Sequence, residues 1–248
     1  MPKPSVIGVI PARIGSTRLA EKPLVKILGK SLIQWVIEGA RTSRKIEKLI
    51  VATDHQKIAE LAKSLGVEAV MTASDIPTGS DRVWTAVKNE SADIILNIQG
   101  DEPLITGELL DSLIVPMQED QKLSMATLAA PITIEELENK NVVKVLTSSV
   151  GDAIYFSRFP IPFSRVNAES KSLAVVRKHI GIYIYRKSFL KKYCEQPVSE
   201  IEKAESLEQL RALYMGERIH IVNTSYEGTG VDTNDDVLRI EKILSSRK

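Results

Sequence analysis

The first hundred residues alternate short runs of branched apolar residues with longer amphipathic segments. Residues 6–10 form a continuous apolar run, which is typical of a strand buried on both faces of a parallel sheet. The expected strands are 6–10, 48–52, 68–71 and 94–98, and the expected helices are 32–40, 56–65 and 81–89. Because strands that alternate with helices pair in parallel, this pattern predicts an α/β fold with a mainly parallel central sheet.

The second half of the chain has more strands and fewer helices. The expected strands are 125–129, 142–146, 153–156, 179–185 and 219–223, the expected helices are 200–214 and 235–246, and residues 158–178 are expected to form a loop. Between the halves there is no linker rich in Gly, Ser or Pro. We therefore expect one domain over residues 1–248, with a smaller β region inserted into it.

Charge and cysteine content exclude several classes of protein. The 248 residues include 33 Lys and Arg against 32 Asp and Glu, a balance that argues against a protein that coats nucleic acid. With Cys194 as the one cysteine, an intramolecular disulfide and a cysteine-rich zinc site are excluded. Because no apolar run reaches the roughly 18 residues of a membrane span and no signal peptide is recognisable, we expect a cytoplasmic protein.

Three polar or glycine-rich segments follow expected strands, at 11–23, 99–103 and 228–232. Ligands of open α/β sheets bind at the carboxyl ends of the strands. Segment 11–23 contains two Arg, one Lys, two hydroxyl residues and a Gly, and main-chain N–H groups beside such cations suit a polyphosphate. It matches neither the dinucleotide fingerprint nor the Walker loop. The structural alternative is a solvated basic loop.

Two acidic residues are candidate metal ligands. Asp101 directly follows an expected strand, and Asp232 lies in the glycine-containing segment 228–233. Mg²⁺ takes one or two carboxylates together with substrate phosphates. The alternatives are a turn at Asp101 and a cap of the terminal helix by Asp232 or Thr233. Paired with a polyphosphate loop, the two residues favour the interpretation as a Mg²⁺ site.

The remaining candidates for catalysis are weak. Of the three histidines, only His179 lies next to a basic segment on an expected strand, and a lone histidine is more often structural than catalytic. There is no zinc-ligand spacing and no nucleophile elbow. Cys194 lies in an amphipathic segment and is expected to be an unreactive residue that contributes only to packing.

Taken in order, these segments resemble the 3-deoxy-manno-octulosonate cytidylyltransferase family, from Val6 to about Arg239. The resemblance rests on Ile10-Pro11-Ala12-Arg13, Ser16-Thr17-Arg18, Lys22-Pro23-Leu24, Val51-Ala52-Thr53-Asp54, Gln99-Gly100-Asp101-Glu102-Pro103, Tyr155-Phe156-Ser157-Arg158, His179-Ile180-Gly181-Ile182-Tyr183, Leu207-Glu208-Gln209-Leu210-Arg211 and Gly228-Thr229-Gly230-Val231-Asp232-Thr233. Each segment alone is weak evidence, whereas the set in this order is highly specific.

The resemblance implies a reaction in which CTP and a 3-deoxy-2-keto acid sugar give the CMP-sugar and pyrophosphate. It also implies a fold like that of nucleotide-diphospho-sugar transferases, dependence on Mg²⁺, a homodimer and a role in lipopolysaccharide assembly. A close alternative for the substrate is the 8-amino analogue of the sugar. Alternatives for the enzyme are a sialic acid cytidylyltransferase and a hexose-phosphate uridylyltransferase. A nucleotide-binding module that has lost catalysis is the alternative outside the enzymes.

The resemblance also assigns site residues. The implied catalytic residues are Arg13, Lys22, Asp101 and Asp232, of which the two aspartates would hold Mg²⁺. The implied CTP-binding residues are Ala12, Arg13, Ser16, Lys22, Thr78, Gly79, Ser80 and Arg82, the last four facing the cytosine together with Asp81. The implied sugar-binding residues are Gln99, Arg158, His179, Tyr183, Glu208 and Gln209.

This chain departs from the family pattern at two places. The family has Pro-Gly before its Lys-Pro, where this chain has Ala20-Glu21. Glu21 is therefore expected to place an anion beside the polyphosphate loop. The family also has a His where this chain has Ile76, a change expected to alter the sugar or base pocket.

Overall fold

The computed structural model describes residues 4–15, 18–163, 165, 173–228 and 230–246. The chain divides into two compact units, of which the first comprises Met1–Ile114 with Gly228–Lys248 and the second Val115–Glu227. The C-terminal segment therefore belongs to the unit that contains the N-terminal sheet. The expectation that the whole chain forms one domain stays a prediction.

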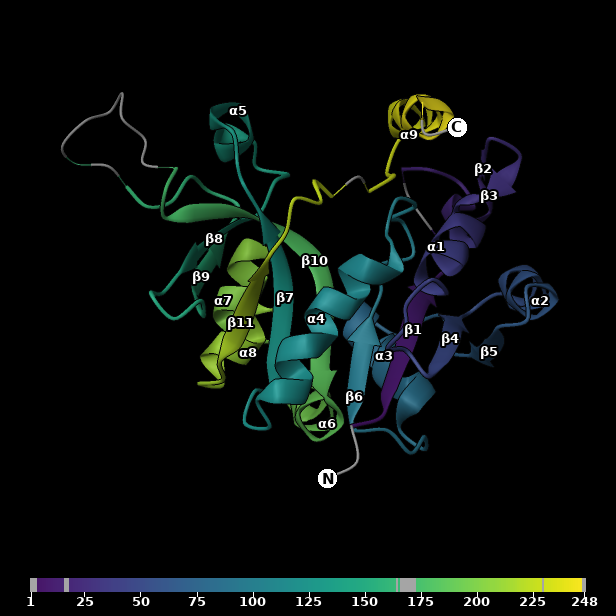
Figure 1. Cartoon of the computed structure of the whole chain (residues 1–248), viewed down its shortest axis with the longest axis horizontal. Helices are drawn as coiled ribbons and strands as arrows, with labels where there is room; N and C mark the ends of the chain where they lie inside the picture. The colour runs from purple at the N-terminus through teal and green to yellow at the C-terminus, as the bar shows by residue number, and fades with distance from the viewer. Residues whose placement is uncertain (1–3, 16–17, 164, 166–172, 229, 247–248) are drawn as a thin grey trace. The chain divides into compact units, whose positions relative to one another are not determined.

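A parallel sheet forms the centre of the first unit (Figure 1). Its strands are β1 (Val6–Ala12), β4 (Lys48–Thr53), β5 (Glu68–Met71) and β6 (Ile94–Asn97), in the order β6-β1-β4-β5. Within this unit β1 lies between β6 and β4, and Val6, Val9 and Ile10 are fully buried. This burial agrees with the continuous apolar run and confirms the mainly parallel sheet.

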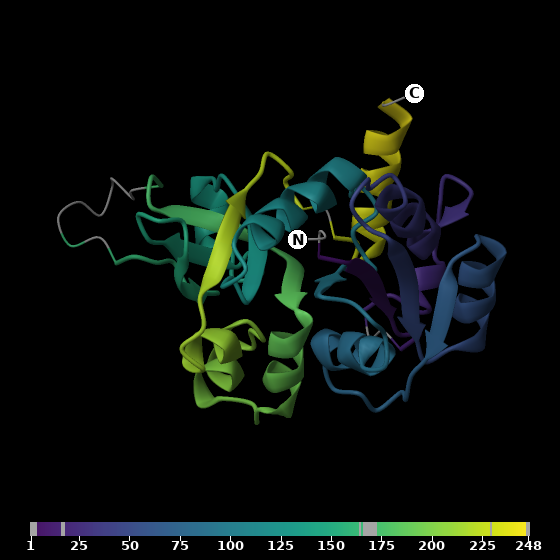
Figure 2. The ribbon, with the colours of Figure 1, turned by 60° about the horizontal axis from the view of Figure 1, so that its bottom comes forward.

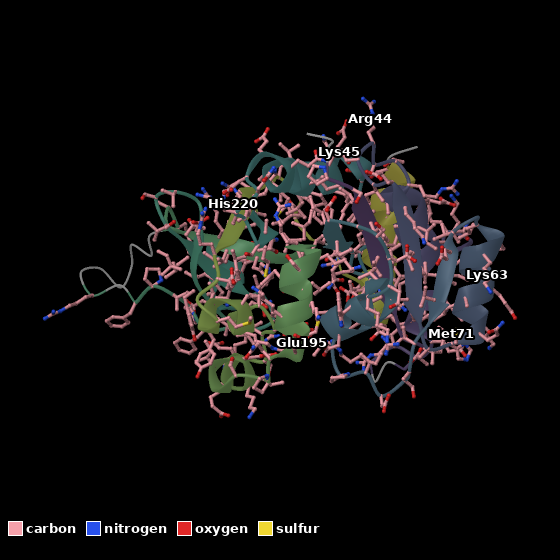
Figure 3. All side chains as sticks on the ribbon, turned by 90° about the horizontal axis from the view of Figure 1, so that it is seen from below. Arg44, Lys45, Lys63, Met71, Glu195 and His220 are labelled. Atoms are coloured by element: carbon pink, nitrogen blue, oxygen red, sulfur yellow. The ribbon has the colours of Figure 1, made fainter. Side chains whose placement is uncertain are left out.

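The helices of the first unit are α1 (Leu32–Ala40), α2 (Gln56–Ser64), α3 (Gly79–Val87), the start of α4 (Gly107–Glu119) and α9 (Asn234–Ser246). Helix α2 packs on β4 and β5, and α3 packs on β1, β4 and β6. Figure 3 labels Lys63 on α2 and the exposed Met71 at the end of β5, which lie at the same edge of this unit.

The C-terminal helix α9 lies beside a small antiparallel hairpin, β2 (Lys26–Ile27) and β3 (Lys30–Ser31), as Figures 1 and 2 show. The main-chain N–H of Leu28 in the hairpin turn donates to the Glu241 carboxylate at 3.1 Å. Sequence periodicity did not predict this hairpin, because each strand has only two residues. Its turn residues Leu28 and Gly29 have positive φ angles of 47° and 83°, so the glycine was the one local signal in the turn.

The second unit contains a mixed sheet. Its strands are β7 (Met125–Ala130), β8 (Lys144–Thr147), β9 (Ala153–Ser157), β10 (Val176–Arg186) and β11 (Ile219–Asn223). Strand β11 is parallel to β7, whereas β10 is antiparallel to both β7 and β8, and β8 is antiparallel to β9. The helices of this unit are α5 (Ile134–Glu138), α6 (Lys187–Glu195), α7 (Glu200–Glu205) and α8 (Leu210–Tyr214). In the described part of the chain, no helix is both long and apolar enough to cross a membrane.

Two expectations for this unit were wrong. The single helix expected at 200–214 is two helices, because Ser206 adopts a left-handed conformation with φ 52° that ends α7. The expected loop at 158–178 is shorter at its C-terminal end, because Val176–Lys178 already pair with β8. In both cases the prediction used side-chain patterns, which report neither a left-handed residue nor the pairing of a strand with a distant one. Three helices were not predicted: α4, which contains Pro116, α5 and α6.

Candidate active site

The carboxyl end of β1 opens into a cavity of about 350 Å³ in the first unit. Its lining residues are Pro11, Ala12, Arg13, Gly15, Arg18, Lys22, Pro23, Gln99, Gly100, Asp101 and Asp232. The three segments that the sequence placed at strand ends therefore meet at one cavity. Ser16 and Thr229, which also belong to these segments, lie outside the described residues.

Lys22 joins the two predicted metal ligands. Its Nζ donates to Asp101 Oδ2 at 2.6 Å and to Asp232 Oδ1 at 2.7 Å, so both carboxylates converge on one point. Arg18 contacts the other oxygen of Asp232 at 3.1 Å. Burial by itself lowers the pKa of Lys22, but the charges and hydrogen bonds of Asp101 and Asp232 outweigh it, and the pKa is raised. The ammonium is therefore charged at neutral pH.

The short helix η1 (Lys22–Leu24) carries this lysine, and Glu21 precedes it in a left-handed conformation with φ 46° and ψ 36°. Glycine adopts this conformation at least cost, which explains the Gly of the family pattern. The Glu21 carboxylate lies 3.4 Å from the Lys57 ammonium on α2. The anion expected beside the polyphosphate loop is thus paired with a cation.

Main-chain hydrogen bonds hold the segment of Asp232 in place. The N–H of Val231 donates to the carbonyl oxygen of Asp101 at 2.9 Å. The Asp236 Oδ2 atom accepts from the N–H of Asp232 at 3.0 Å, and from the N–H and the hydroxyl of Thr233 at 2.9 Å each. Thr233 in turn accepts from the N–H of Asp236 at 3.3 Å. The cap predicted at the terminal helix is therefore made by Thr233 and Asp236, and the Asp232 carboxylate is left to face Lys22.

Gly100 allows strand ends β1 and β6 to approach each other. A Cβ atom at this position would lie 2.8 Å from the carbonyl oxygen of Pro11, too close for any side chain. The glycine therefore brings Asp101 next to the loop that follows β1.

The two carboxylates fit a Mg²⁺ ion. Among the described residues, no group of three or more His, Cys, Asp or Glu side chains surrounds such a position. Two carboxylates are nevertheless sufficient, because Mg²⁺ commonly completes its shell with substrate phosphates and water. Asp101 and Asp232 already place one oxygen each within 2.7 Å of a single cationic atom. Their donor set and convergence therefore match the ion.

The segment predicted to face the cytosine begins α3 next to β1. The hydroxyl of Thr78 accepts from the N–H of Asp81 at 3.1 Å and so caps the helix. Gly79 lies against the Pro11 ring, and Ser80 is buried. Ile76, which replaces the family's His, is half-buried. The segment thus lies beside the cavity, and its contact with the base stays a prediction.

Arg82 is 3% exposed. It donates to the Thr72 hydroxyl, and its Nη2 lies 4.0 Å from Asp54 Oδ2 without a hydrogen-bond partner among the described residues. Burial lowers the pKa of Arg82, and the nearby Arg13 charge lowers it further against the opposing effect of Asp54. Asp54 also accepts from the N–H of Ile14 at 2.9 Å, which ties Arg82 to the loop after β1.

In the second unit, three of the predicted sugar-binding residues are close together. The rings of His179 and Tyr183 lie 5.5 Å apart, and the Tyr183 hydroxyl donates to Gln209 Oε1 at 3.1 Å. A register shift in β10 between Ile180 and Tyr183 interrupts the pairing with β7 between these two residues. Gln209 is 2% exposed, and its Nε2 finds no acceptor among the described residues. A buried donor without a partner is costly, and a polar ligand would satisfy it.

His179 is neutral. Burial lowers its pKa to about 3. Its Nε2 lies 3.0 Å from the Thr127 hydroxyl, which also reaches the carbonyl oxygens of Ile180 and Ile182 at 3.1 and 2.8 Å. Because the hydroxyl has one proton and both carbonyls can only accept, the tautomer with its proton on His179 Nε2, which leaves Nδ1 as an acceptor, satisfies the most hydrogen bonds.

Arg158 and Glu208 are the other two predicted sugar ligands in this unit. The guanidinium of Arg158 donates to the carbonyl oxygens of Glu205, Lys140 and Ser206 at 3.0, 3.3 and 3.4 Å. Burial raises the pKa of Tyr183 well above its usual value, with Glu208 adding to the increase and Arg158 opposing it. Both charges therefore act at Tyr183, but the Arg158 donors serve the main chain, and its contact with the sugar stays a prediction.

The other two histidines have structural contacts, as expected. His55 caps α2 by accepting from the N–H of Lys57 at 3.3 Å. His220, labelled in Figure 3, lies on β11 with Nδ1 3.3 Å from the Asp152 carboxylate.

Sequence reasoning missed three residues of these clusters: Arg18, Thr127 and Asp236. Arg18 and Asp236 had a sequence signal, since Arg18 lies in the basic segment and Thr233 with Asp236 has the spacing of a helix cap. Thr127 had none, because it lies in the middle of an apolar strand.

A parallel sheet with a cationic loop and paired carboxylates at its strand ends is the architecture of a nucleotidyltransferase. A family model described as cytidylyltransferase matches residues 7–219. The solved structure of CMP:2-keto-3-deoxy-manno-octonic acid synthetase complexed with CTP superposes with a TM-score of 0.93 at 39% identity, covering 98% of this chain and 100% of that one. The 4-diphosphocytidyl-2C-methyl-D-erythritol synthase of Anaerococcus prevotii, at 13% identity and a TM-score of 0.68, shares the fold alone.

Curated relatives identify the family within the nucleotidyltransferases. The chain is 53% identical over 243 residues to the 3-deoxy-manno-octulosonate cytidylyltransferase of Bdellovibrio bacteriovorus, with 98% of each chain covered. It is 40% identical to that of Acidobacterium capsulatum, again over 98% of each chain. The chain belongs to the 3-deoxy-manno-octulosonate cytidylyltransferase family. The resemblance seen in the sequence is therefore confirmed.

Proposed function

We propose that the protein transfers CMP from CTP to 3-deoxy-D-manno-octulosonate, and so supplies an activated sugar for lipopolysaccharide assembly. The observation that carries this proposal is the convergence of Asp101 and Asp232 on Lys22 in the cavity at the end of β1. Family membership at 53% identity supports the choice of CTP and of this sugar.

The anomeric hydroxyl of the sugar attacks the α-phosphorus of CTP. A new oxygen–phosphorus bond forms, the bond to the bridging oxygen of the departing pyrophosphate breaks, and the hydroxyl proton passes to solvent. Such transfers depend on positioning and on neutralising phosphoryl oxygens. Arg13 and Lys22 neutralise the β- and γ-phosphoryl oxygens, and Arg82 with the start of α3 binds the base.

Asp101 and Asp232 hold Mg²⁺ in this proposal. When bound, the ion supplies charge neutralisation at the phosphates and a lower pKa for the attacking hydroxyl. In the second unit, Gln209 Nε2 offers a donor to the sugar and the Nδ1 of neutral His179 offers an acceptor. Gln99 lines the cavity of the first unit, and its contact with the sugar stays a prediction.

Pyrophosphate release tests the reaction. Each of the four nucleoside triphosphates is combined with 3-deoxy-D-manno-octulosonate, its 8-amino analogue and a sialic acid, with Mg²⁺ or with a chelator. We expect release with CTP, Mg²⁺ and the first sugar. Preference for the 8-amino analogue would move the assignment to that substrate, and no release with any pair would favour a binding module without catalysis.

We also propose a cytoplasmic homodimer. The second unit has exposed apolar side chains suited to an interface, such as Ile154, Phe159 and Phe163, which are 59%, 66% and 90% exposed. Light scattering coupled to size exclusion tests the dimer, and replacing Phe159 with Ser should weaken it. Fractionation of cells tests the location, where recovery from the membrane pellet would contradict the proposal.

A further inference from the structure

Lys22 occupies the position that a divalent cation needs. Its Nζ lies 2.6 Å from one oxygen of Asp101 and 2.7 Å from one oxygen of Asp232. A metal ion bridging these two oxygens would have to lie between them, where the ammonium already is. Both cannot be accommodated, because a charged ammonium next to Mg²⁺ would be strongly repelled.

Arg18 strengthens this arrangement. Its Nη2 lies 3.1 Å from the second oxygen of Asp232. Two cationic side chains therefore balance the two carboxylates. The net charge offered to an incoming metal ion is then close to zero, which removes most of the electrostatic attraction.

The two cations differ in how firmly they are held. The Lys22 side chain is 15% exposed and contacts both carboxylates, whereas Arg18 is 66% exposed and contacts one. Solvent screens the exposed pair more strongly. Lys22 is therefore the residue that controls access to the carboxylates.

We infer that Lys22 is a placeholder that keeps the metal position occupied until a nucleotide arrives. The triphosphate offers Lys22 new anionic oxygens, the ammonium moves to them, and Asp101 and Asp232 become free for the ion that the triphosphate brings. The divalent ion therefore enters together with the nucleotide rather than before it. This inference rests on the proposed metal role of the two carboxylates, and it adds an order of binding.

Binding of Mn²⁺ to the protein without nucleotide tests the placeholder, read from the electron paramagnetic resonance signal of free Mn²⁺. We expect weak binding by the wild type and at least about tenfold tighter binding by Lys22→Met, because a unit charge beside both ligands is removed. Lys22→Arg keeps the charge and should bind as weakly as the wild type. Lys57→Met removes a lysine that pairs with Glu21, the residue before Lys22, and should also leave binding weak.

The double variant Lys22→Met with Asp101→Asn should lose the gained affinity. If Lys22→Gln is better folded than Lys22→Met, as judged by thermal unfolding, it serves in its place. Equal Mn²⁺ affinity of the wild type and the neutral variants would overturn the placeholder, as would tight binding by Lys22→Arg. Failure of the proposed reaction appears separately, as absence of pyrophosphate release by the wild type.

Discussion

The main-chain N–H of Val231 donates a 2.9 Å hydrogen bond to the carbonyl oxygen of Asp101. This bond joins the segment before the C-terminal helix to the strand end of β6. Asp232 directly follows the anchored Val231, and its own N–H donates to the Asp236 carboxylate. The two carboxylates proposed to hold Mg²⁺ are thus positioned by main-chain hydrogen bonds, while their side chains remain available to a cation.

Replacing Asp101 with Asn should reduce turnover at least about 100-fold, since a metal ion contributes several kcal/mol to such reactions. Pyrophosphate release at saturating CTP and sugar measures the effect. The matched control is Asp93→Asn. Asp93 lies just before β6, the strand that precedes Asp101, and its carboxylate accepts hydrogen bonds from Ser5 instead of Lys22. Near-normal turnover of Asp101→Asn, with the fold retained, would remove the metal role.

Replacing Asp236 with Ala should lower turnover about 10- to 100-fold, because small misplacements of reacting groups cost this much. The change removes the acceptor for the N–H groups of Asp232 and Thr233. Asp236→Asn keeps an acceptor oxygen and should recover most of the turnover. Arg239→Ala removes only the 2.9 Å pair with the other oxygen of Asp236 and serves as the control. If Asn were as impaired as Ala, hydrogen bonding would not be the reason.

Replacing Glu21 with Gly should stabilise the protein by about 1 kcal/mol, since a left-handed conformation costs a non-glycine residue about that much. The exposed pair with Lys57 that is lost contributes little. Urea unfolding measures the free energy, and Lys57→Met alone shows the contribution of the pair. A less stable Glu21→Gly protein would show that strain at this residue is not significant.

Stability should depend on pH through His179. Its pKa is about 3 in the folded protein, against 6.5 for the free side chain, so only the unfolded chain binds this proton between those values. The stabilising effect is therefore complete above pH 6.5 and is lost as the pH falls, amounting to about 2 kcal/mol between pH 7 and pH 5.

The variant His179→Gln lacks this proton and should lose correspondingly less stability over that range. Urea unfolding of both proteins at pH 7 and pH 5 measures the difference. His55 and His220 are present in both, so their effects cancel. Parallel loss of stability in the two proteins would mean that His179 is not held neutral.

Periodicity along the chain was sufficient for the strands of the large sheet and for helices α1, α2, α3 and α9. The apolar run of β1 and the amphipathic pattern of α1 and α2 are local properties, and burial of one face follows from them. The end of α7 at Ser206 was missed, because a leucine pattern does not report a left-handed residue between two helices.

Local sequence was enough to predict the parallel α/β fold, the cationic loop after β1 and the residue types that match the family, because these depend on neighbours within a few positions. The pairing of Lys22 with Asp232, 210 positions away, and the contacts of the Arg158 guanidinium with main-chain carbonyls became visible only in the folded chain. Partners of this kind are chosen by packing between distant segments, and no short-range pattern encodes the distance between two side chains that meet only after folding.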